Sequence, residues 1–250
     1  MQKIFLILCL ILSTSILNAG TIDPKKNDSL YLRLAEKYSC CLRLHSLGKH
    51  SNQSVSTGSC VLVRPNIVLT AAHIMELHKD CNFCIYDNGK MIKIKKIYVP
   101  KKFNLNKISY YDIAVCVLDS PASPKPCEIS YAKPRPNTQV TIAGFGMLGN
   151  FDTGAQKLND NRLRAGFNRI DGYQNQCMIL SAKRNSYMTS AEYLIVGGDS
   201  GGGVFLDNKL VAINSYISAK NSRHPNGMWN EESGHTCLYF VHDWINTILD

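Results

Sequence analysis

Three short segments carry residues whose types suit nucleophilic acyl transfer. Leu69–His73 supplies a histidine, Tyr111–Val115 an aspartate, and Gly197–Gly202 a serine within a glycine-rich turn. A serine hydroxyl is a weak nucleophile at neutral pH, so it needs a base to take its proton. The base in turn needs a third group that fixes its tautomer. His73, Asp112 and Ser200 are therefore the candidate base, orienting group and nucleophile.

Each candidate also has an ordinary structural interpretation. A histidine after two alanines is commonly structural, an aspartate before a strand commonly caps a turn, and Gly-Asp-Ser-Gly can simply be a tight loop. The occurrence of all three in one β-rich chain favours the catalytic interpretation. An esterase would use the same chemistry, but its serine usually sits in a Gly-x-Ser-x-Gly elbow of an α/β fold, before the histidine. Here the histidine comes first.

The first twenty residues have the layout of a secretory signal peptide. Lys3 is positive, Ile4–Leu12 is an uninterrupted apolar run, and the small residues Ala19 and Gly20 suit cleavage. The run is too short to span a bilayer, and no later stretch is long and apolar enough. We therefore expect no membrane span and a secreted or periplasmic protein. The alternative for this segment is a buried N-terminal helix.

The remaining chain reads as short strands separated by turn residues, which predicts a barrel or sandwich fold. A proline-rich stretch over 121–136 divides the strands into two groups, as an interdomain linker would. Helices are predicted only over His73–His78 and Val241–Leu249. The predicted strands are Cys40–Leu44, Ser59–Val63, Ile67–Thr70, Met91–Val99, Ile113–Leu118, Gln139–Gly144, Arg162–Ile170, Cys177–Ser181, Gly203–Leu206, Lys209–Ser215 and Thr236–Phe240.

The formal net charge of +9 owes much to one lysine-rich stretch. Such a stretch either attracts a polyanion or acidic substrate, or is only a solvated strand face, which is the more frequent case. We name the seven side chains the lysine surface: Lys90, Lys93, Lys95, Lys96, Lys101, Lys102 and Lys107.

Nine cysteines follow the signal segment, so an oxidising compartment predicts several disulfides and at least one unpaired thiol. Cys81 and Cys84 form an isolated CxxC. Zinc would need two further ligands nearby, so disulfide pairing is the preferred interpretation and no metal site is predicted.

Taken together, these segments resemble those of the chymotrypsin-like (trypsin-like, S1-type) serine proteases. Val140–Gly146 is similar to the strand that opens the family's second barrel, and Leu210–Tyr216 to the strand that lines its cleft. The resemblance implies an all-β fold of two six-stranded antiparallel barrels with a short C-terminal helix. It divides the chain into a signal peptide over 1–20, a first barrel over 37–120, a linker over 121–136, and a second barrel with the terminal helix over 137–250.

The resemblance also implies a role for each residue. His73 acts as general base and then acid, Asp112 orients it, and Ser200 attacks the carbonyl carbon. The backbone N–H groups of Gly198 and Ser200 form the oxyanion hole. The implied activity is that of a secreted serine endopeptidase working through an acyl-enzyme, without a cofactor. Its partners are a polypeptide substrate and a protein inhibitor, and no nucleic acid is expected.

The chain departs from the family's pattern in two ways that matter. Ile74 stands where the commonest disulfide of the family places a cysteine after the histidine. In addition, no activation peptide of the type Arg-Ile-Val-Gly-Gly is present. In zymogen members a new N-terminal amine pairs with the aspartate that matches Asp199. Here either another group holds Asp199 or the site forms without proteolysis, and we expect constitutive activity.

Substrate preference is read from the positions that match the family's binding pocket. Leu194 falls at the base of the pocket, where a basic side chain would find no carboxylate. Ser215, Tyr216 and Ile217 fall along the cleft strand, and Ile217 replaces a usual glycine. These residues predict a non-tryptic enzyme that prefers a small aliphatic residue before the scissile bond. The alternative function is that of a non-catalytic binding protein on a serine-protease scaffold, because Ile217 also suits a blocked pocket.

Overall fold

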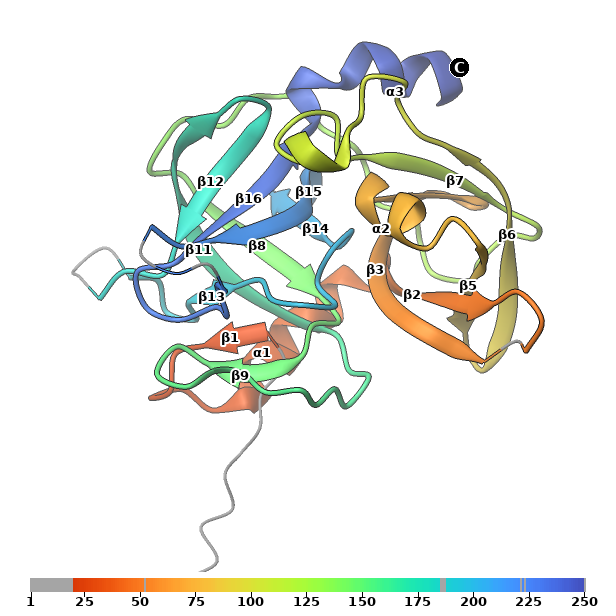
Figure 1. Cartoon of the computed structure of the whole chain (residues 1–250). Helices are drawn as coiled ribbons and strands as arrows, with labels where there is room; N and C mark the ends of the chain where they lie inside the picture. Colours follow the sequence, from red (N-terminus) through yellow and green to blue (C-terminus); the bar gives the residue numbers. More distant parts are fainter. Residues whose placement is uncertain (1–19, 52, 185–187, 221, 223, 250) are drawn as a thin grey trace, which may run out of the picture.

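The computed structural model describes residues 20–51, 53–184, 188–220, 222 and 224–249. Residues 1–19 of the predicted signal peptide over 1–20 lie outside these residues, whereas Gly20 is the first residue of a short strand, β1 (Gly20–Ile22). Two barrels stand side by side, joined by a long linker, with the C-terminal helix across the top (Figure 1). None of the helices in the described residues is long and apolar enough to cross a membrane.

The first closed barrel carries the candidate histidine and aspartate. Its strands follow the spatial order β2-β3-β4-β7-β6-β5. In the antiparallel pair β4–β7, Thr70 lies opposite Ala114. The chain that leaves β4 and the chain that enters β7 therefore meet at the same end of the barrel. The bounds are β2 (Cys41–Gly48), β3 (Ser54–Arg64), β4 (Ile67–Thr70), β5 (Cys81–Asp87), β6 (Lys90–Tyr98) and β7 (Ala114–Leu118).

The second closed barrel carries the candidate serine, in the loop before β14. Its strands follow the order β11-β12-β16-β15-β14-β8. A β-bulge in β15 between Asn214 and Tyr216 shifts the register against β16. Bulges re-aim side chains, and this one lies at Ser215. The bounds are β8 (Gln139–Gly144), β11 (Arg164–Gln174), β12 (Cys177–Ser181), β14 (Gly203–Leu206), β15 (Lys209–Ser218) and β16 (Glu232–Cys237).

The two barrels share a hydrophobic core. The apolar cluster inside barrel one continues through Phe205, Leu210 and Leu238 of barrel two into α3 (His242–Leu249). Tyr38 bridges the barrels, since its ring packs 4.5 Å from that of Phe205 and its hydroxyl lies 3.1 Å from the hydroxyl of Thr141. Because packed interiors deform little, this shared core fixes the barrels relative to each other.

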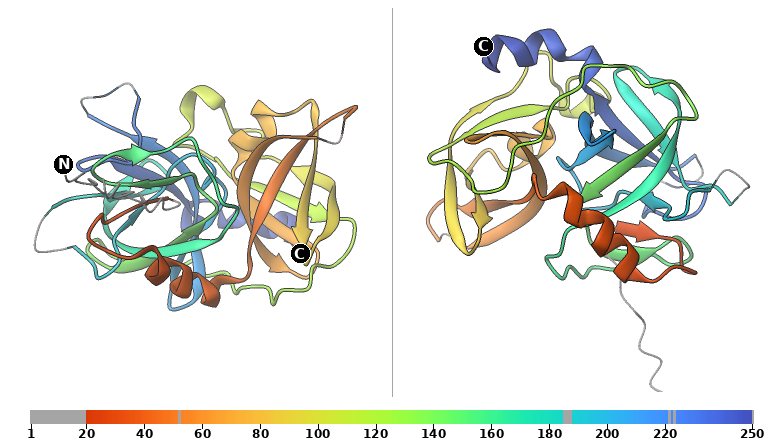
Figure 2. Two further views of the ribbon diagram at one scale, coloured as in Figure 1. Left: turned by 90° about the horizontal axis from the view of Figure 1, so that it is seen from below. Right: turned by 180° about the vertical axis from the view of Figure 1, so that it is seen from behind.

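The N-terminal segment was not predicted and packs on barrel two (Figure 2). The strand β1 (Gly20–Ile22) is inserted between β9 (Leu148–Asn150) and β13 (Tyr193–Leu194), and β10 (Gly154–Ala155) completes this small sheet. The helix α1 (Asp28–Ala35), capped by the side chain of Asn27, then lies against β11. A 3-10 turn, η1 (Glu36–Tyr38), leads into barrel one.

The fold predicted from the sequence is confirmed as two closed six-stranded barrels with a short C-terminal helix. Several local predictions differ from the structure. Residues 238–240 form the 3-10 turn η3 (Leu238–Phe240) rather than the end of a strand. The strand β5, which contains the CxxC, was missed, and so were the short strands β9, β10 and β13 and the helix α1. Two short helices complete the described elements, α2 (Ala72–Leu77) and the 3-10 turn η2 (Leu105–Lys107).

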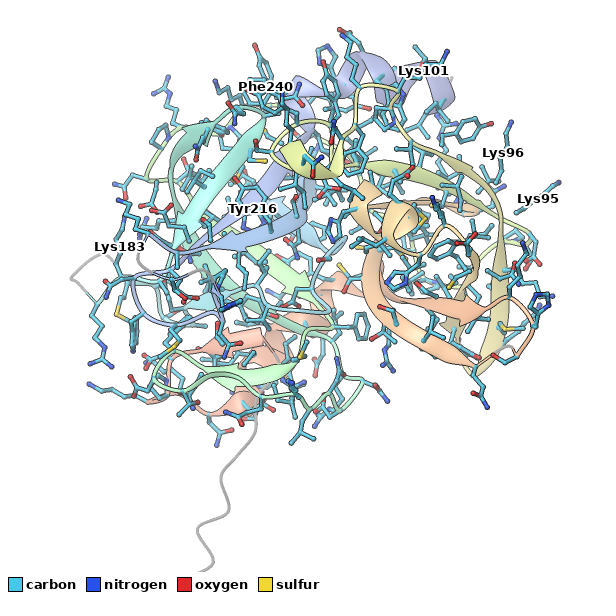
Figure 3. All side chains as sticks on the ribbon, in the orientation of Figure 1. Lys95, Lys96, Lys101, Lys183, Tyr216 and Phe240 are labelled. Carbon is cyan, nitrogen blue, oxygen red and sulfur yellow. The ribbon has the colours of Figure 1, made fainter. Side chains whose placement is uncertain are left out.

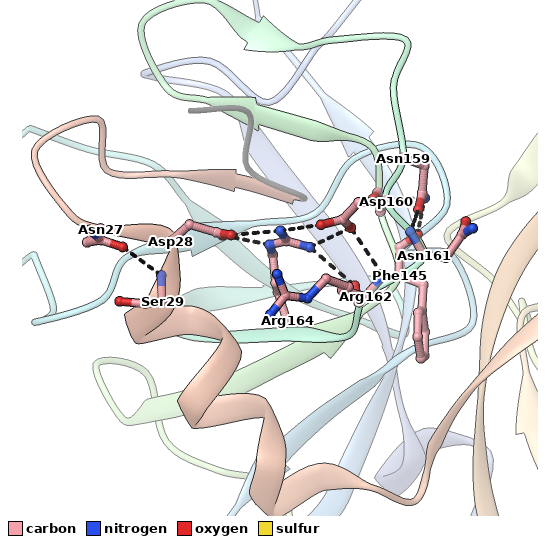
Figure 4. Close-up of polar contacts among 10 residues, drawn as sticks. Asn27, Asp28, Ser29, Phe145, Asn159, Asp160, Asn161, Arg162 and Arg164 are labelled. Atoms are coloured by element: carbon pink, nitrogen blue, oxygen red, sulfur yellow. Dashed lines mark hydrogen bonds and ion pairs between the residues drawn. The ribbon is translucent and has the colours of Figure 1, made fainter. Parts of the chain in front are cut away.

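A buried ion cluster fastens α1 to barrel two (Figure 4). The guanidinium of Arg164 is 1% exposed. It donates to both carboxylate oxygens of Asp28, at 2.6 and 2.7 Å, and to both of Asp160, at 2.8 Å. These contacts raise the pKa of Arg164 despite its burial. The guanidinium is thus bound by two carboxylates, each of which accepts two of its N–H groups.

We predict that Asp28→Ala lowers the free energy of unfolding by about 3 kcal/mol, because it leaves half of a buried guanidinium without its partner. Urea denaturation measures this loss. Lys183→Ala is the matched control, since Lys183 pairs with Asp171 at the surface and its side chain is 49% exposed. That change should cost less than about 1 kcal/mol. Equal losses in the two variants would contradict the buried role of Asp28.

Candidate active site

The carboxylate of Asp112 is fully buried where the barrels meet, and it accepts bonds from both. One oxygen accepts the backbone N–H of His73 at 2.8 Å. The other lies 2.8 Å from His73 Nδ1 and also accepts the hydroxyl of Ser215. Thr236 of barrel two binds the backbone oxygen of Asp112 at 2.9 Å. Such a carboxylate is stable in the interior only because donors satisfy it.

This contact fixes the orientation and tautomer of His73. The residue lies in the first turn of α2, directly after β4, and its side chain is 11% exposed. An ionised carboxylate can only accept, so Nδ1 carries the proton and donates it to Asp112. Nε2 is thereby left as the acceptor nitrogen, free to take a proton from a hydroxyl. Tyr111, which precedes Asp112, adopts a φ of +56°, a conformation rare for a tyrosine.

The loop that carries Ser200 is tied to barrel one next to His73. The backbone oxygen of Ser200 accepts the N–H of Ser59 at 2.8 Å. The hydroxyl of Ser59 donates to Gly198 O at 2.9 Å and accepts from Phe145 N at 3.0 Å. Gly201 packs directly on Thr70, three residues before His73, where a Cβ would collide with the threonine hydroxyl. Ser200 itself is half-buried.

Two backbone N–H groups of this loop have the properties that an anion site requires. Gly198 has a φ of +96°, and a Cβ there would press on the backbone of Phe145 and Gly146. Glycine is therefore needed at this turn. Within the described residues, the N–H groups of Gly198 and Ser200 donate to no backbone or side-chain acceptor, while those of Asp199, Gly201 and Gly202 do. An oxyanion between the two uncommitted donors would be stabilised.

Asp199 lies beneath this loop, fully buried. Its carboxylate accepts Gly146 N at 2.8 Å, Val196 N at 2.9 Å and the Tyr193 hydroxyl at 3.0 Å. Burial raises the pKa of Asp199 to about 7, although the three donors act in the opposite direction. Desolvation therefore outweighs the hydrogen bonds at this group.

A buried network behind the loop was missed by the sequence reasoning. His235 lies 2.9 Å from Asn214 Oδ1 through Nδ1, and 2.8 Å from the Ser233 hydroxyl through Nε2. Burial lowers its pKa to about 3, so the ring is neutral at neutral pH. Asn214 then donates to the backbone oxygens of Ala143, at 3.1 Å, and Asp199, at 3.2 Å. No sequence signal identifies this set, because strand pairing alone brings His235 beside Asn214.

The predicted pocket residues do not all share one surface. Leu194 is fully buried in an apolar cluster with Phe151 and Ala182. Ser215 directs its hydroxyl to Asp112. Tyr216 is half-buried, with its ring over Gly234 on the neighbouring strand, and Ile217 packs against the core of barrel two. Leu194 is thus in fully buried, apolar surroundings, and its assignment to the base of a pocket stays a prediction.

No group of three or more metal-binding side chains occurs in the part of the chain that the structure describes. All nine cysteines, from Cys40 to Cys237, are free thiols in the structure. Cys84 is buried and Cys81 half-buried on β5. The disulfides expected from the compartment therefore stay a prediction.

Comparison with known proteins extends these observations. The family model named Trypsin matches residues 23–232. No curated protein sequence matches the chain. Among solved structures, neuropsin, a serine protease expressed in the limbic system of mouse brain, is similar with a TM-score of 0.63 and 18% identity. That match covers 86% of this chain and 96% of neuropsin.

Human heparin binding protein is a second similar structure. Its TM-score is 0.59 at 15% identity, and the match covers 83% of this chain and 91% of that protein. A mutant of heparin binding protein is similar with a TM-score of 0.60 and 15% identity, covering 83% and 90%. At these identities the likeness to solved structures shows the fold.

We predict that Asp199 makes stability fall as pH rises. Its folded pKa of about 7 exceeds the ordinary 3.8, so the folded state keeps a proton that the unfolded state releases. The contribution is therefore fully present below about pH 4 and is lost as pH rises through about 7. Urea denaturation across this range should show wild type losing stability relative to Asp199→Asn. A relative stability that is constant or rises with pH would refute the shift.

Proposed function

Because the chain belongs to the trypsin family, we propose that it is a secreted serine endopeptidase that cleaves peptide bonds through an acyl-enzyme. The observation that carries this proposal is the buried His73–Asp112 pair, held where the barrels meet, beside the loop of Ser200. Membership of the family alone would not require these residues to lie together.

In the proposed reaction, each group acts once in the acylation step and once in the deacylation step. The hydroxyl oxygen of Ser200 attacks the carbonyl carbon of the peptide bond while Nε2 of His73 takes its proton. The N–H groups of Gly198 and Ser200 donate to the oxyanion of the tetrahedral intermediate. The imidazolium, stabilised by Asp112, then protonates the leaving amine, and the C–N bond breaks. A water molecule attacks the resulting ester by the same path and releases the acid product.

We predict that Ser200→Ala or His73→Ala each lowers turnover of a peptide substrate by about four orders of magnitude or more. The double variant should lose little more, because the two residues act as one unit. A phosphonate probe should label wild type and not Ser200→Ala. Losses that add in the double variant would contradict the shared role, and an unlabelled wild type would contradict the proposed activity.

We infer a preference for a small aliphatic residue before the scissile bond. The fully buried, apolar surroundings of Leu194 offer no partner to a basic or acidic substrate side chain. A buried charge without a partner is costly, so such substrates are disfavoured.

A peptide library profiled with the purified enzyme tests this preference. Alanine and valine should dominate at the position before the cleaved bond, by about tenfold or more over charged residues. A profile dominated by arginine, lysine or glutamate at this position would refute the inference.

A second candidate function is a binding protein on the same scaffold, and the lysine surface favours it. All seven lysines are exposed, and none takes part in an ion pair within the described residues. Lys95 and Lys96 project from the outer edge of barrel one and Lys101 lies at the top beside α3, all away from Tyr216 (Figure 3). One similar structure is human heparin binding protein, whose name states that it binds heparin. Phosphonate labelling distinguishes the candidates, since an idle site would not react.

A further inference from the structure

Asp199 holds the shape of the Ser200 loop, and it does so with neutral partners. Its buried carboxylate accepts two backbone N–H groups and the Tyr193 hydroxyl. In the described residues no lysine, arginine or histidine forms an ion pair with it. A buried carboxylate in this situation depends on each of its donors. Tyr193 supplies the only one of these three donors that comes from a side chain.

Neighbouring residues enclose the Tyr193 side chain on all sides. The residue is fully buried in β13, opposite Ile22 of β1. The ring of Tyr31 lies 6.4 Å away, and Asn168 donates to the backbone oxygen of Tyr193 at 3.0 Å. Gly20, with a φ of +63°, lies against the hydroxyl end of the ring, where a Cβ would collide with it. The hydroxyl is thereby held toward Asp199.

On its other side, the carboxylate of Asp199 lies against two glycines. A Cβ at Gly144 or Gly146 would collide with its oxygens, so these glycines let the carboxylate fill the space. The backbone of Asp199 is itself hydrogen-bonded within the Ser200 loop. Its N–H donates to Val196 O at 3.0 Å, and its backbone oxygen accepts Gly202 N at 2.9 Å. The two uncommitted donors, Gly198 and Ser200, are the residues on either side of Asp199.

We propose that Tyr193 is a positioning residue, whose hydroxyl holds Asp199 and so keeps the N–H groups of Gly198 and Ser200 in place without any cationic partner. This inference rests on the proposed function. It identifies the group that replaces an N-terminal ammonium at Asp199.

The variant Tyr193→Phe removes the hydroxyl oxygen and little else. We expect kcat for a peptide substrate to fall about 10- to 100-fold while KM changes less than about threefold, because the lost restraint acts on transition-state donors. A peptide aldehyde inhibitor, whose adduct needs the same donors, should weaken in parallel with kcat. Tyr31→Phe is the matched control, a buried tyrosine beside Tyr193 that makes no contact with Asp199. It should leave kcat and aldehyde affinity within about twofold.

A variant that loses stability but keeps kcat and aldehyde affinity would overturn the positioning role. A second measurement needs no variant. Cyanate near pH 6 to 7 blocks α-amino groups before lysines, since their pKa is about 8 rather than about 10.4. Wild type should keep its activity when it is treated in this way with a reversible peptide aldehyde in the site. Loss of activity with carbamoylation confined to the α-amino group, as measured by mass spectrometry, would show that an ammonium group holds Asp199. A wild type that no phosphonate labels would instead refute the proposed function, and the positioning role with it.

Discussion

The burial of the Asp112 carboxylate between the two barrels is the constraint on which the site depends. A charge removed from water must be satisfied by fixed donors, and here each barrel supplies some of them. His73 donates twice from the turn after β4, and Ser215 donates from the bulge in β15. The barrels must therefore keep one relative position for the carboxylate to remain satisfied. The shared core around Phe205 and Leu238 provides that rigidity.

Three buried carboxylates of the chain are satisfied in three different ways. Asp28 is paired with a fully desolvated guanidinium, Arg164, and this pair fastens the N-terminal helix. Asp112 faces an imidazole whose charge can change during a reaction. Asp199 accepts hydrogen bonds from neutral donors alone within the described residues, and burial raises its pKa. A permanent cation thus anchors the N-terminal helix through Asp28, an imidazole is oriented by Asp112, and neutral donors hold Asp199 beneath its loop.

Glycines and neutral polar groups define the space around the Ser200 loop. Gly198 permits a left-handed turn, and Gly201 permits contact with the strand that leads to His73. Behind the loop, the neutral His235 fixes the amide of Asn214, which in turn caps the backbone of Asp199. The loop is therefore held by backbone and neutral side-chain contacts from both barrels. Its own N–H groups at Gly198 and Ser200 are left without acceptors in the part of the chain described.

Much of this protein can be predicted from local sequence. Alternating apolar residues identify most strands, such as Ile67–Thr70 and Gln139–Gly144, because strand periodicity is a local property. His73, Asp112 and Ser200 stand out because each lies in a distinctive local context. The strand β5 and the segment from Gly20 to Tyr38 were missed, since neither carries a clear periodic pattern.

Only the tertiary structure decides which distant residues meet. Strand pairing brings His235 to Asn214, and barrel packing brings Ser215 to Asp112 and Tyr193 to Asp199. A hydroxyl or an amide has no sequence signature for its partner, because hydrogen bonds depend on distance in space and not along the chain. Local sequence identifies the candidate residues. The tertiary fold determines their hydrogen-bond partners, and burial determines their protonation states.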